Sequence, residues 1–85
     1  MLLLIISYTL FMQMNMAVAE TIKALRKQKG VSQEKLADAI DSHQVYISEI
    51  EKGKKIPSLT ILHNFAVFFN ISLTELVSRI EEKLN

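Results

Sequence analysis

Apolar residues recur at spacings of three and four along most of the chain, which is the period of one face of an α-helix. Serine precedes three of the apolar runs, and glycine or asparagine follows three of them, as is typical of helix starts and ends. The expected caps are Ser32, Ser58 and Ser72 at the starts and Gly30, Gly53 and Asn70 at the ends. The pattern predicts an all-α bundle of five helices without strands, at about residues 17–29, 33–40, 44–52, 59–69 and 73–84.

The first nineteen residues carry no charged side chain, and Leu2–Ile6 is apolar on every face of a helix. A cleaved secretory signal would need basic residues before the apolar run, whereas the first basic residue is Lys23. A second interpretation is a membrane anchor, with the basic residues that follow it on the cytoplasmic side. The third, which we favour, is a soluble protein in which residues 1–16 form an apolar N-terminal extension and residues 17–85 form the domain.

The apolar stripe of the first predicted helix continues upstream of the domain, at Phe11, Met14, Val18, Ile22 and Leu25. Some of the extension should therefore be helical, and we expect this helix to begin between residues 12 and 19. Alternative translation starts are available at Met12, Met14 and Met16.

The composition excludes several kinds of chemistry. The chain has 85 residues, no Cys, two His and two Gly. A chain of this length builds one small core, without a second lobe or a deep cleft. Disulfides and thiolate metal sites are excluded, and so few His and Gly residues form neither a His-rich metal site nor a phosphate-binding loop. We therefore expect no metal, no cofactor and no enzymatic activity.

The net charge of +1 hides an uneven distribution. Residues 23–55 carry eight basic and five acidic side chains, whereas the segments on either side are each slightly acidic. A local basic patch attracts phosphate groups. Charge alone nevertheless favours an ordinary solvated helix surface, so any role in nucleic-acid binding has to be argued from a motif.

The most informative stretch is residues 33–52, where two short helices are separated by only two or three residues. So short a turn forces the helices to cross steeply, and a steep crossing requires a small residue on the inner face of the first helix. Ala37 meets that requirement, while Ile47 and Ile50 are spaced to fill the angle between the helices. This is the geometry of a helix-turn-helix, whose second helix can enter the major groove of DNA.

Several segments resemble the Xre or Cro/cI-type (lambda-repressor-like) helix-turn-helix domain: Ser32–Ala37, Tyr46–Lys54, Ile56–Leu59 and, for the first helix, Ile22–Gly30. The resemblance covers about residues 22–77, and the small size is similar to that of restriction–modification controller proteins. It implies a cytoplasmic, DNA-binding transcriptional regulator with its recognition helix at about residues 44–52.

The turn departs from the family pattern at two positions. Asp41 stands where the family usually has Gly, although Asp tolerates a left-handed backbone better than most residues do. Ser42 replaces an apolar residue and needs a local hydrogen bond for its hydroxyl. His43 stands at the N-cap of the next helix, where we expect it to be a poor cap that faces solvent.

The start of the recognition helix should point into the major groove. Gln44 can form two hydrogen bonds with adenine, and Val45 can touch a thymine methyl group. The base-contacting candidates are Gln44, Val45, Ser48 and Glu49. The phosphate-contacting candidates are Gln33, Tyr46, Lys52, Lys54 and Lys55.

Two further residues are expected to have no part in recognition. Glu51 is expected to be structural, as a partner of Lys55. His63 is expected to be a surface residue of the fourth helix.

One recognition helix covers only a few base pairs, so we expect the protein to bind double-stranded DNA as a homodimer. The dimer patch predicted on the last helix consists of Leu76, Ile80 and Leu84, with the alternative that this stripe is wholly intramolecular. Two other functions stay open, an antitoxin with a toxin as protein partner and a membrane-tethered interaction module anchored by residues 1–19. Residues 1–11 are expected to be dispensable for DNA binding, and the alternative is that they form part of a subunit interface.

Overall fold

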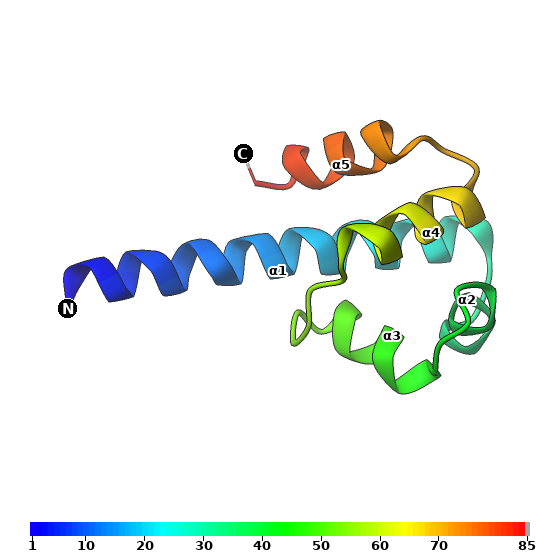
Figure 1. Cartoon of the computed structure of the whole chain (residues 1–85), viewed down its shortest axis with the longest axis horizontal. Helices are drawn as coiled ribbons and strands as arrows, with labels where there is room; N and C mark the ends of the chain where they lie inside the picture. Colours follow the sequence, from blue (N-terminus) through cyan, green and yellow to red (C-terminus); the bar gives the residue numbers. More distant parts are fainter. Residues whose placement is uncertain (85) are drawn as a thin grey trace.

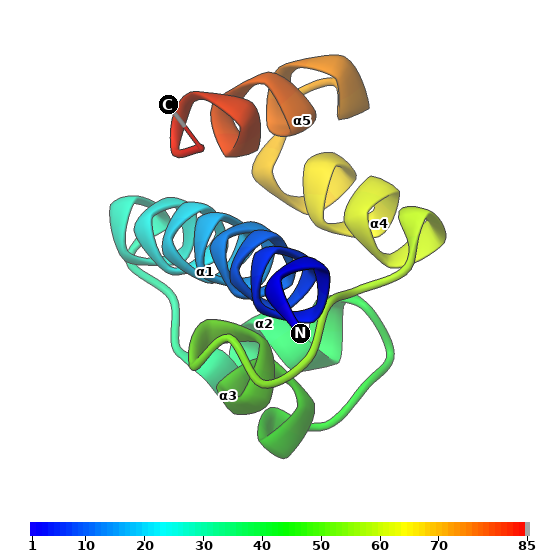
Figure 2. The same ribbon diagram turned by 90° about the vertical axis from the view of Figure 1, so that its left-hand side faces the viewer.

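A computed structural model of the chain describes residues 1–84 and contains, over those residues, five α-helices and no strand. The helices are α1 (Leu2–Lys29), α2 (Gln33–Ala39), α3 (Gln44–Glu51), α4 (Leu59–Phe69) and α5 (Leu73–Glu82). In Figures 1 and 2, α1 runs through the molecule with α2 and α3 on one side and α5 on the other, while α4 packs beside it. The predicted all-α fold is confirmed.

The core lies where α1 packs against α3, α4 and α5, and α2 joins it by packing against α3. Its largest fully buried apolar side chains are Ile22, Leu36, Ile47, Ile50, Phe65 and Leu76, so every helix contributes at least one. Burial of each such side chain stabilises the fold by roughly 1.5–3 kcal/mol relative to leaving it in water. Packing rather than helix propensity therefore holds α2 and α3, because helices of seven and eight residues are unstable alone.

The ends of the helices follow the predicted caps. The hydroxyls of Ser32, Ser58 and Ser72 each accept a hydrogen bond from the backbone N–H three residues later, at 3.0 to 3.2 Å. Gly30, Gly53 and Asn70 all have positive φ angles. The observed bounds of α2 to α5 lie within two residues of those predicted.

Gly53 has a second constraint besides its φ of +75°. A Cβ atom at this position would lie 2.5 Å from Sδ of Met16 on α1. The carbonyl of Gly53 also accepts a hydrogen bond of 3.1 Å from the buried amide of Asn15. The end of α3 is thus held against the middle of α1.

The first helix begins much earlier than predicted. α1 starts at Leu2 rather than between residues 12 and 19, because no Gly or Pro interrupts the apolar run and a helix, once started, propagates readily. Residues 1–14 are nevertheless exposed, and burial begins at Asn15. Of the predicted stripe, Val18, Ile22 and Leu25 are buried, whereas Phe11 and Met14 lie outside the core. By length and composition α1 also qualifies as a helix that could cross a membrane.

Candidate nucleic-acid interface

The crossing of α2 and α3 has the geometry predicted from the sequence. Ala37 is 1% exposed, and its carbonyl accepts hydrogen bonds from the backbone N–H groups of Ile40 and Ser42 at 3.2 and 2.8 Å. Ile47 and Ile50 are fully buried. The connection comprises residues 40–43, slightly longer than predicted, because α2 ends at Ala39 and Ile40 only caps it.

The two unusual turn residues are accommodated without breaking the motif. Asp41 has a φ of 57°, in the left-handed region that Asp tolerates better than most residues. The backbone N–H of Ser42 is satisfied by Ala37, and its side chain is half-buried. His43 makes no capping hydrogen bond with its side chain and is exposed, as expected.

A chain of side chains links α1, α2 and α3 behind the recognition surface. Arg26 donates to both carboxylate oxygens of Glu51, at 2.7 and 3.0 Å, and to the carbonyl of Val31 at 2.9 Å. Gln33 donates to Glu51 at 3.1 Å and accepts a hydrogen bond from the side-chain amide of Gln44. The hydrogen bonds to Glu51 raise the pKa of the Arg26 guanidinium, although burial alone would lower it.

This network corrects one expectation and adds residues that sequence reasoning missed. Glu51 is structural, as predicted, but its partner is Arg26 rather than Lys55, because the Glu51 side chain is 3% exposed and points into the domain. Lys55 instead lies 3.8 Å from Glu49. Arg26 was not singled out, since it lies 25 residues away from Glu51 and no local spacing connects them.

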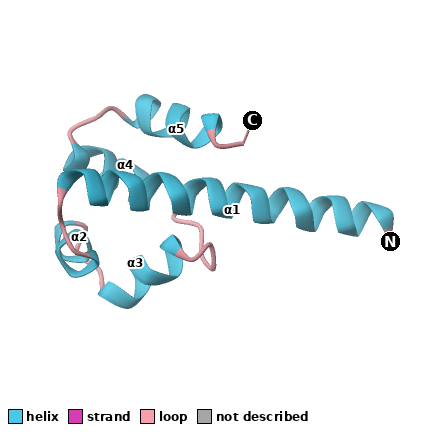
Figure 3. Ribbon diagram, turned by 180° about the vertical axis from the view of Figure 1, so that it is seen from behind, coloured by secondary structure: helices cyan, strands magenta, loops and turns pink. Residues whose placement is uncertain are grey.

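α3 lies on the side of the molecule away from α5 (Figures 1 and 3). The residues predicted to contact bases stand at positions 44, 45, 48 and 49 of the chain, a spacing that places them along one side of this helix. Gln44 and Val45 are exposed, and Val45 has 63% of its surface open to solvent. Ser48 and Glu49, one turn further on, are half-buried. An exposed valine at the start of a helix, beside an oriented glutamine, presents both an apolar and a hydrogen-bonding group to a ligand.

The lysines predicted to contact phosphate follow at the end of α3. Lys52, Lys54 and Lys55 are all exposed. Lys55 lies over the ring of Tyr46, with 6.0 Å between its ammonium nitrogen and the ring centroid. Tyr46 is half-buried, and this burial raises the pKa of its hydroxyl. The Lys55 ammonium group and the Tyr46 ring are therefore placed for a cation–π interaction at the edge of the candidate DNA-binding surface.

The dimer patch predicted on α5 needs correction. Leu76 and Ile80 are 0% and 5% exposed, because both fill the core of the monomer. Leu84, which lies just beyond the end of α5, remains accessible, as does Val77 on α5. Two of the three predicted patch residues are therefore intramolecular, and the alternative that the whole stripe is intramolecular does not hold either, because Leu84 is exposed.

Within the described part of the chain there is no group of three or more Asp, Glu or His side chains that could hold a metal ion. His63 is exposed on α4, as expected.

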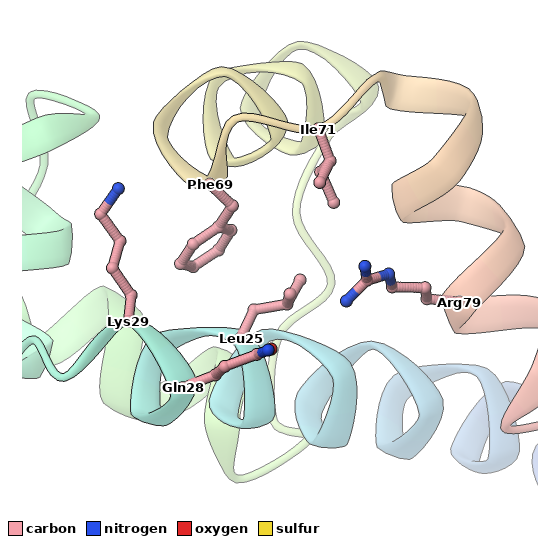
Figure 4. A pocket seen from close by; sticks show the side chains of 6 residues that line it. All are labelled: Leu25, Gln28, Lys29, Phe69, Ile71 and Arg79. Carbon is pink, nitrogen blue, oxygen red and sulfur yellow. The ribbon is translucent and has the colours of Figure 1, made fainter.

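A pocket of about 230 Å³ lies between α1, α4 and α5 and is lined by Leu25, Gln28, Lys29, Phe69, Ile71 and Arg79 (Figure 4). The two positively charged side chains of this pocket, Lys29 and Arg79, both interact with other groups of the protein. Lys29 donates to the carbonyl of Phe68 at 2.9 Å and lies over the Phe68 ring, and Arg79 pairs with Glu75 at 2.9 Å. Lys29 lies at the C-terminus of α4, where its positive charge interacts favourably with the negative end of the helix dipole. Both cations of the pocket thus have structural partners within the protein.

Comparisons with known proteins agree with this geometry. Residues 22–76 match the family HTH_3, described as helix-turn-helix. Over 63 residues the chain is 43% identical to the control protein C.MunI of Mycoplasma sp. The aligned residues cover 73% of this chain and 85% of that protein. Among solved structures, the restriction-modification controller protein C.AhdI from Aeromonas hydrophila superposes with a TM-score of 0.68 at 29% identity, covering 73% of this chain and 90% of that one. The clp gene regulator ClgR from Corynebacterium glutamicum shares the fold, with a TM-score of 0.77 at 24% identity and coverage of 84% and 76%.

Proposed function

Since the chain belongs to the helix-turn-helix family HTH_3 and is a DNA-binding transcriptional regulator rather than an enzyme, we propose that it recognises a specific sequence as a homodimer. In this proposal α3 enters the major groove of DNA in the cytoplasm. The observation that carries the proposal is the hydrogen-bonded pair Gln33–Gln44, which joins the starts of α2 and α3.

Gln44 is prepared for base recognition by this pair. A primary amide has two N–H donors and one acceptor oxygen, and Gln33 occupies only one of the donors of Gln44. The remaining N–H and the oxygen have the arrangement that pairs with N7 and N6 of adenine. Because Gln33 is itself tied to Glu51, the Gln44 amide is oriented before DNA arrives.

Gln33 keeps one amide N–H after bonding to Glu51, and this donor is suited to a phosphate oxygen at the edge of the groove. Lys52, Lys54, Lys55 and Tyr46 are proposed to contact phosphates on the other side. Phosphate contacts of this kind fix the position of the protein on DNA, whereas base contacts supply the sequence preference.

The remaining proposed base contacts extend from Gln44 along α3. Val45 is exposed enough to reach a thymine methyl group. Ser48 can donate or accept, and Glu49 can accept from cytosine N4, once its ion pair with Lys55 is exchanged for a phosphate contact by the lysine.

A homodimer is proposed because one helix of eight residues reads too few base pairs to select a site. Two copies related by a two-fold axis would read two half-sites, with centres about 34 Å or one turn of DNA apart. Val77 on α5 and Leu84 just beyond its end are exposed and available for such contacts.

Selection from randomised double-stranded DNA, followed by sequencing of the bound fraction, tests the proposal. We expect enrichment of a site with two inverted half-sites, and loss of its most strongly preferred position with Gln44→Ala. Gln28→Ala is a matched control, because Gln28 is exposed on α1 and lines the pocket of Figure 4 rather than the surface of α3. Recovery of no preferred sequence would contradict base recognition, and recovery of single half-sites would contradict the homodimer.

A further inference from the structure

The N-terminal half of α1 extends beyond the rest of the domain (Figures 1 and 3), and its residues are apolar and exposed. Leu3 and Leu10 are 79% and 61% exposed, and residues 1–14 carry no charged side chain. Thr9, one of its few polar residues, satisfies its hydroxyl within the helix by donating to the carbonyl of Ile5. Exposure of so large an apolar surface to water is unfavourable for a monomer, and such surfaces mark sites of contact with another molecule.

One face of this segment has the spacing of a helix–helix seam. Leu3, Ser7, Leu10 and Met14 follow one another at intervals of four, three and four residues. This spacing keeps a continuous line of side chains facing a neighbouring helix. The small side chain of Ser7, near the middle of the line, provides room for a large side chain from the other helix.

The seam ends at an apolar groove on the same molecule. The groove has a volume of about 170 Å³ and is lined by residues of α1, α4, α5 and the loop before α4, among them Met14, Val18, Ile56, Leu62, Val77 and Leu84. Met14 belongs to both features, as the last residue of the seam and the first of the groove. The chain therefore carries an exposed apolar helix and, beside it, an apolar surface that can receive one.

We propose that two copies of the chain pair through this seam, with the exposed halves of their α1 helices antiparallel. Residues 3 and 14 of one copy then face residues 14 and 3 of the second, and Ser7 of each faces Leu10 of the other. The seam is about 17 Å long at 1.5 Å per residue, so each Leu3 reaches the groove beside Met14 of the second copy. This inference rests on the homodimer proposed above and names its interface.

A second copy fits this segment better than a membrane does. Residues 2–14 form a helix of about 20 Å, which is shorter than the roughly 30 Å hydrocarbon core of a bilayer. A full span would pull Ala17, Val18 and Ala19 out of the protein core, where they are at most 2% exposed. A helix lying on a bilayer typically carries Lys or Arg on its polar face, and this segment has neither.

Sedimentation of the full-length protein, the Leu10→Lys variant and the Ile5→Lys variant tests the interface. Both positions are exposed and aliphatic, but Ile5 lies on the opposite face of the helix from the seam. We expect Leu10→Lys to raise the dimer dissociation constant at least about tenfold and Ile5→Lys to change it less than about threefold. Equal effects of the two substitutions would overturn the seam. Circular dichroism checks that both variants retain their helices.

The register has its own test, which does not depend on loss of binding. Ser7→Glu and Leu10→Lys place opposite charges on residues that face one another only between copies in the proposed antiparallel pairing. When equal amounts of the two variants are mixed, we expect heterodimers to make up clearly more than the one half of all dimers that random pairing gives. A random distribution of pairs would contradict this register.

Two further outcomes separate this inference from the proposed function. If Leu10→Lys sediments as a dimer like the unchanged protein, the interface is wrong while the homodimer stands. If the unchanged protein is a monomer that floats with phosphatidylcholine vesicles, a membrane covers the helix, and both the interface and the homodimer are wrong. Binding to the selected DNA site, measured for the same samples, tests sequence recognition separately.

Discussion

Arg26 on α1 donates two hydrogen bonds, of 2.7 and 3.0 Å, to the two carboxylate oxygens of Glu51 at the end of α3. The side chains of Arg26 and Glu51 are only 13% and 3% exposed. The pair fixes α3 against α1, and Glu51 in turn holds Gln33. A charge pair with so little access to water is sensitive to loss of either member, because the remaining charge stays buried without a partner.

Replacing Arg26 should therefore destabilise the fold strongly. We expect Arg26→Met to lower the free energy of unfolding by about 3–5 kcal/mol, and the double variant Arg26→Met with Glu51→Met to recover much of that loss. Urea denaturation measures both effects. Arg79→Met is the control, because its partner Glu75 is largely exposed and the expected cost is below about 1 kcal/mol. Equal losses in the single and double variants would show that the ion pair is not the cause.

Gln44→Ala should change sequence preference as well as affinity. We expect a loss of about 1–3 kcal/mol on the best site and a relaxed preference at one position in each half-site. Gln33→Ala should give a weaker form of the same change, because Gln44 loses the group that orients it. Affinities against a panel of singly mutated sites measure this. The assignment fails if Gln44→Ala weakens binding to every DNA by the same factor.

Lys52→Ala should weaken binding to all DNA sequences about equally. Removal of one phosphate contact should reduce the slope of log affinity against log salt concentration by about one unit. Titrations between low and physiological salt measure the slope. Lys83→Ala removes a charge next to α5, on the other side of the molecule, and should leave the slope unchanged.

Ala37→Leu should disrupt the crossing of α2 and α3. Ala37 is 1% exposed, so the added side chain has no space, and overpacking of this kind typically costs about 1–3 kcal/mol. Ala39→Leu enlarges an exposed alanine on the same short helix and should have little effect. Thermal melting compares the two. An unchanged melting temperature for Ala37→Leu would disprove the close crossing.

Local features of the sequence predicted most of the fold. Ser32, Ser58 and Ser72 identify helix starts because a cap acts on the backbone only three residues away. The crossing at Ala37 is also local, since a short turn limits how two helices can be arranged. These elements needed no knowledge of distant contacts.

Other features depended on distant contacts and were missed or mistaken. Arg26 and Glu51 meet only because α3 folds back onto α1. Leu76 and Ile80 have the same spacing whether they face a core or a second subunit, so the pattern could not separate the two. The early start of α1 was not predicted, because residues 2–14 are helical without being packed against the domain.

α1 is one unbroken helix from Leu2 to Lys29. The rotation of its exposed N-terminal half about the helix axis is therefore fixed relative to its packed C-terminal half. If two copies pair through the exposed halves of α1, the geometry of that pairing also fixes how the two α3 helices are placed relative to one another, because no hinge lies between. Deleting one residue of α1 between the seam and the core would turn one half against the other by about 100° and shorten it by about 1.5 Å. The length of this helix would then act as a molecular ruler, setting which spacing of half-sites on DNA the protein accepts.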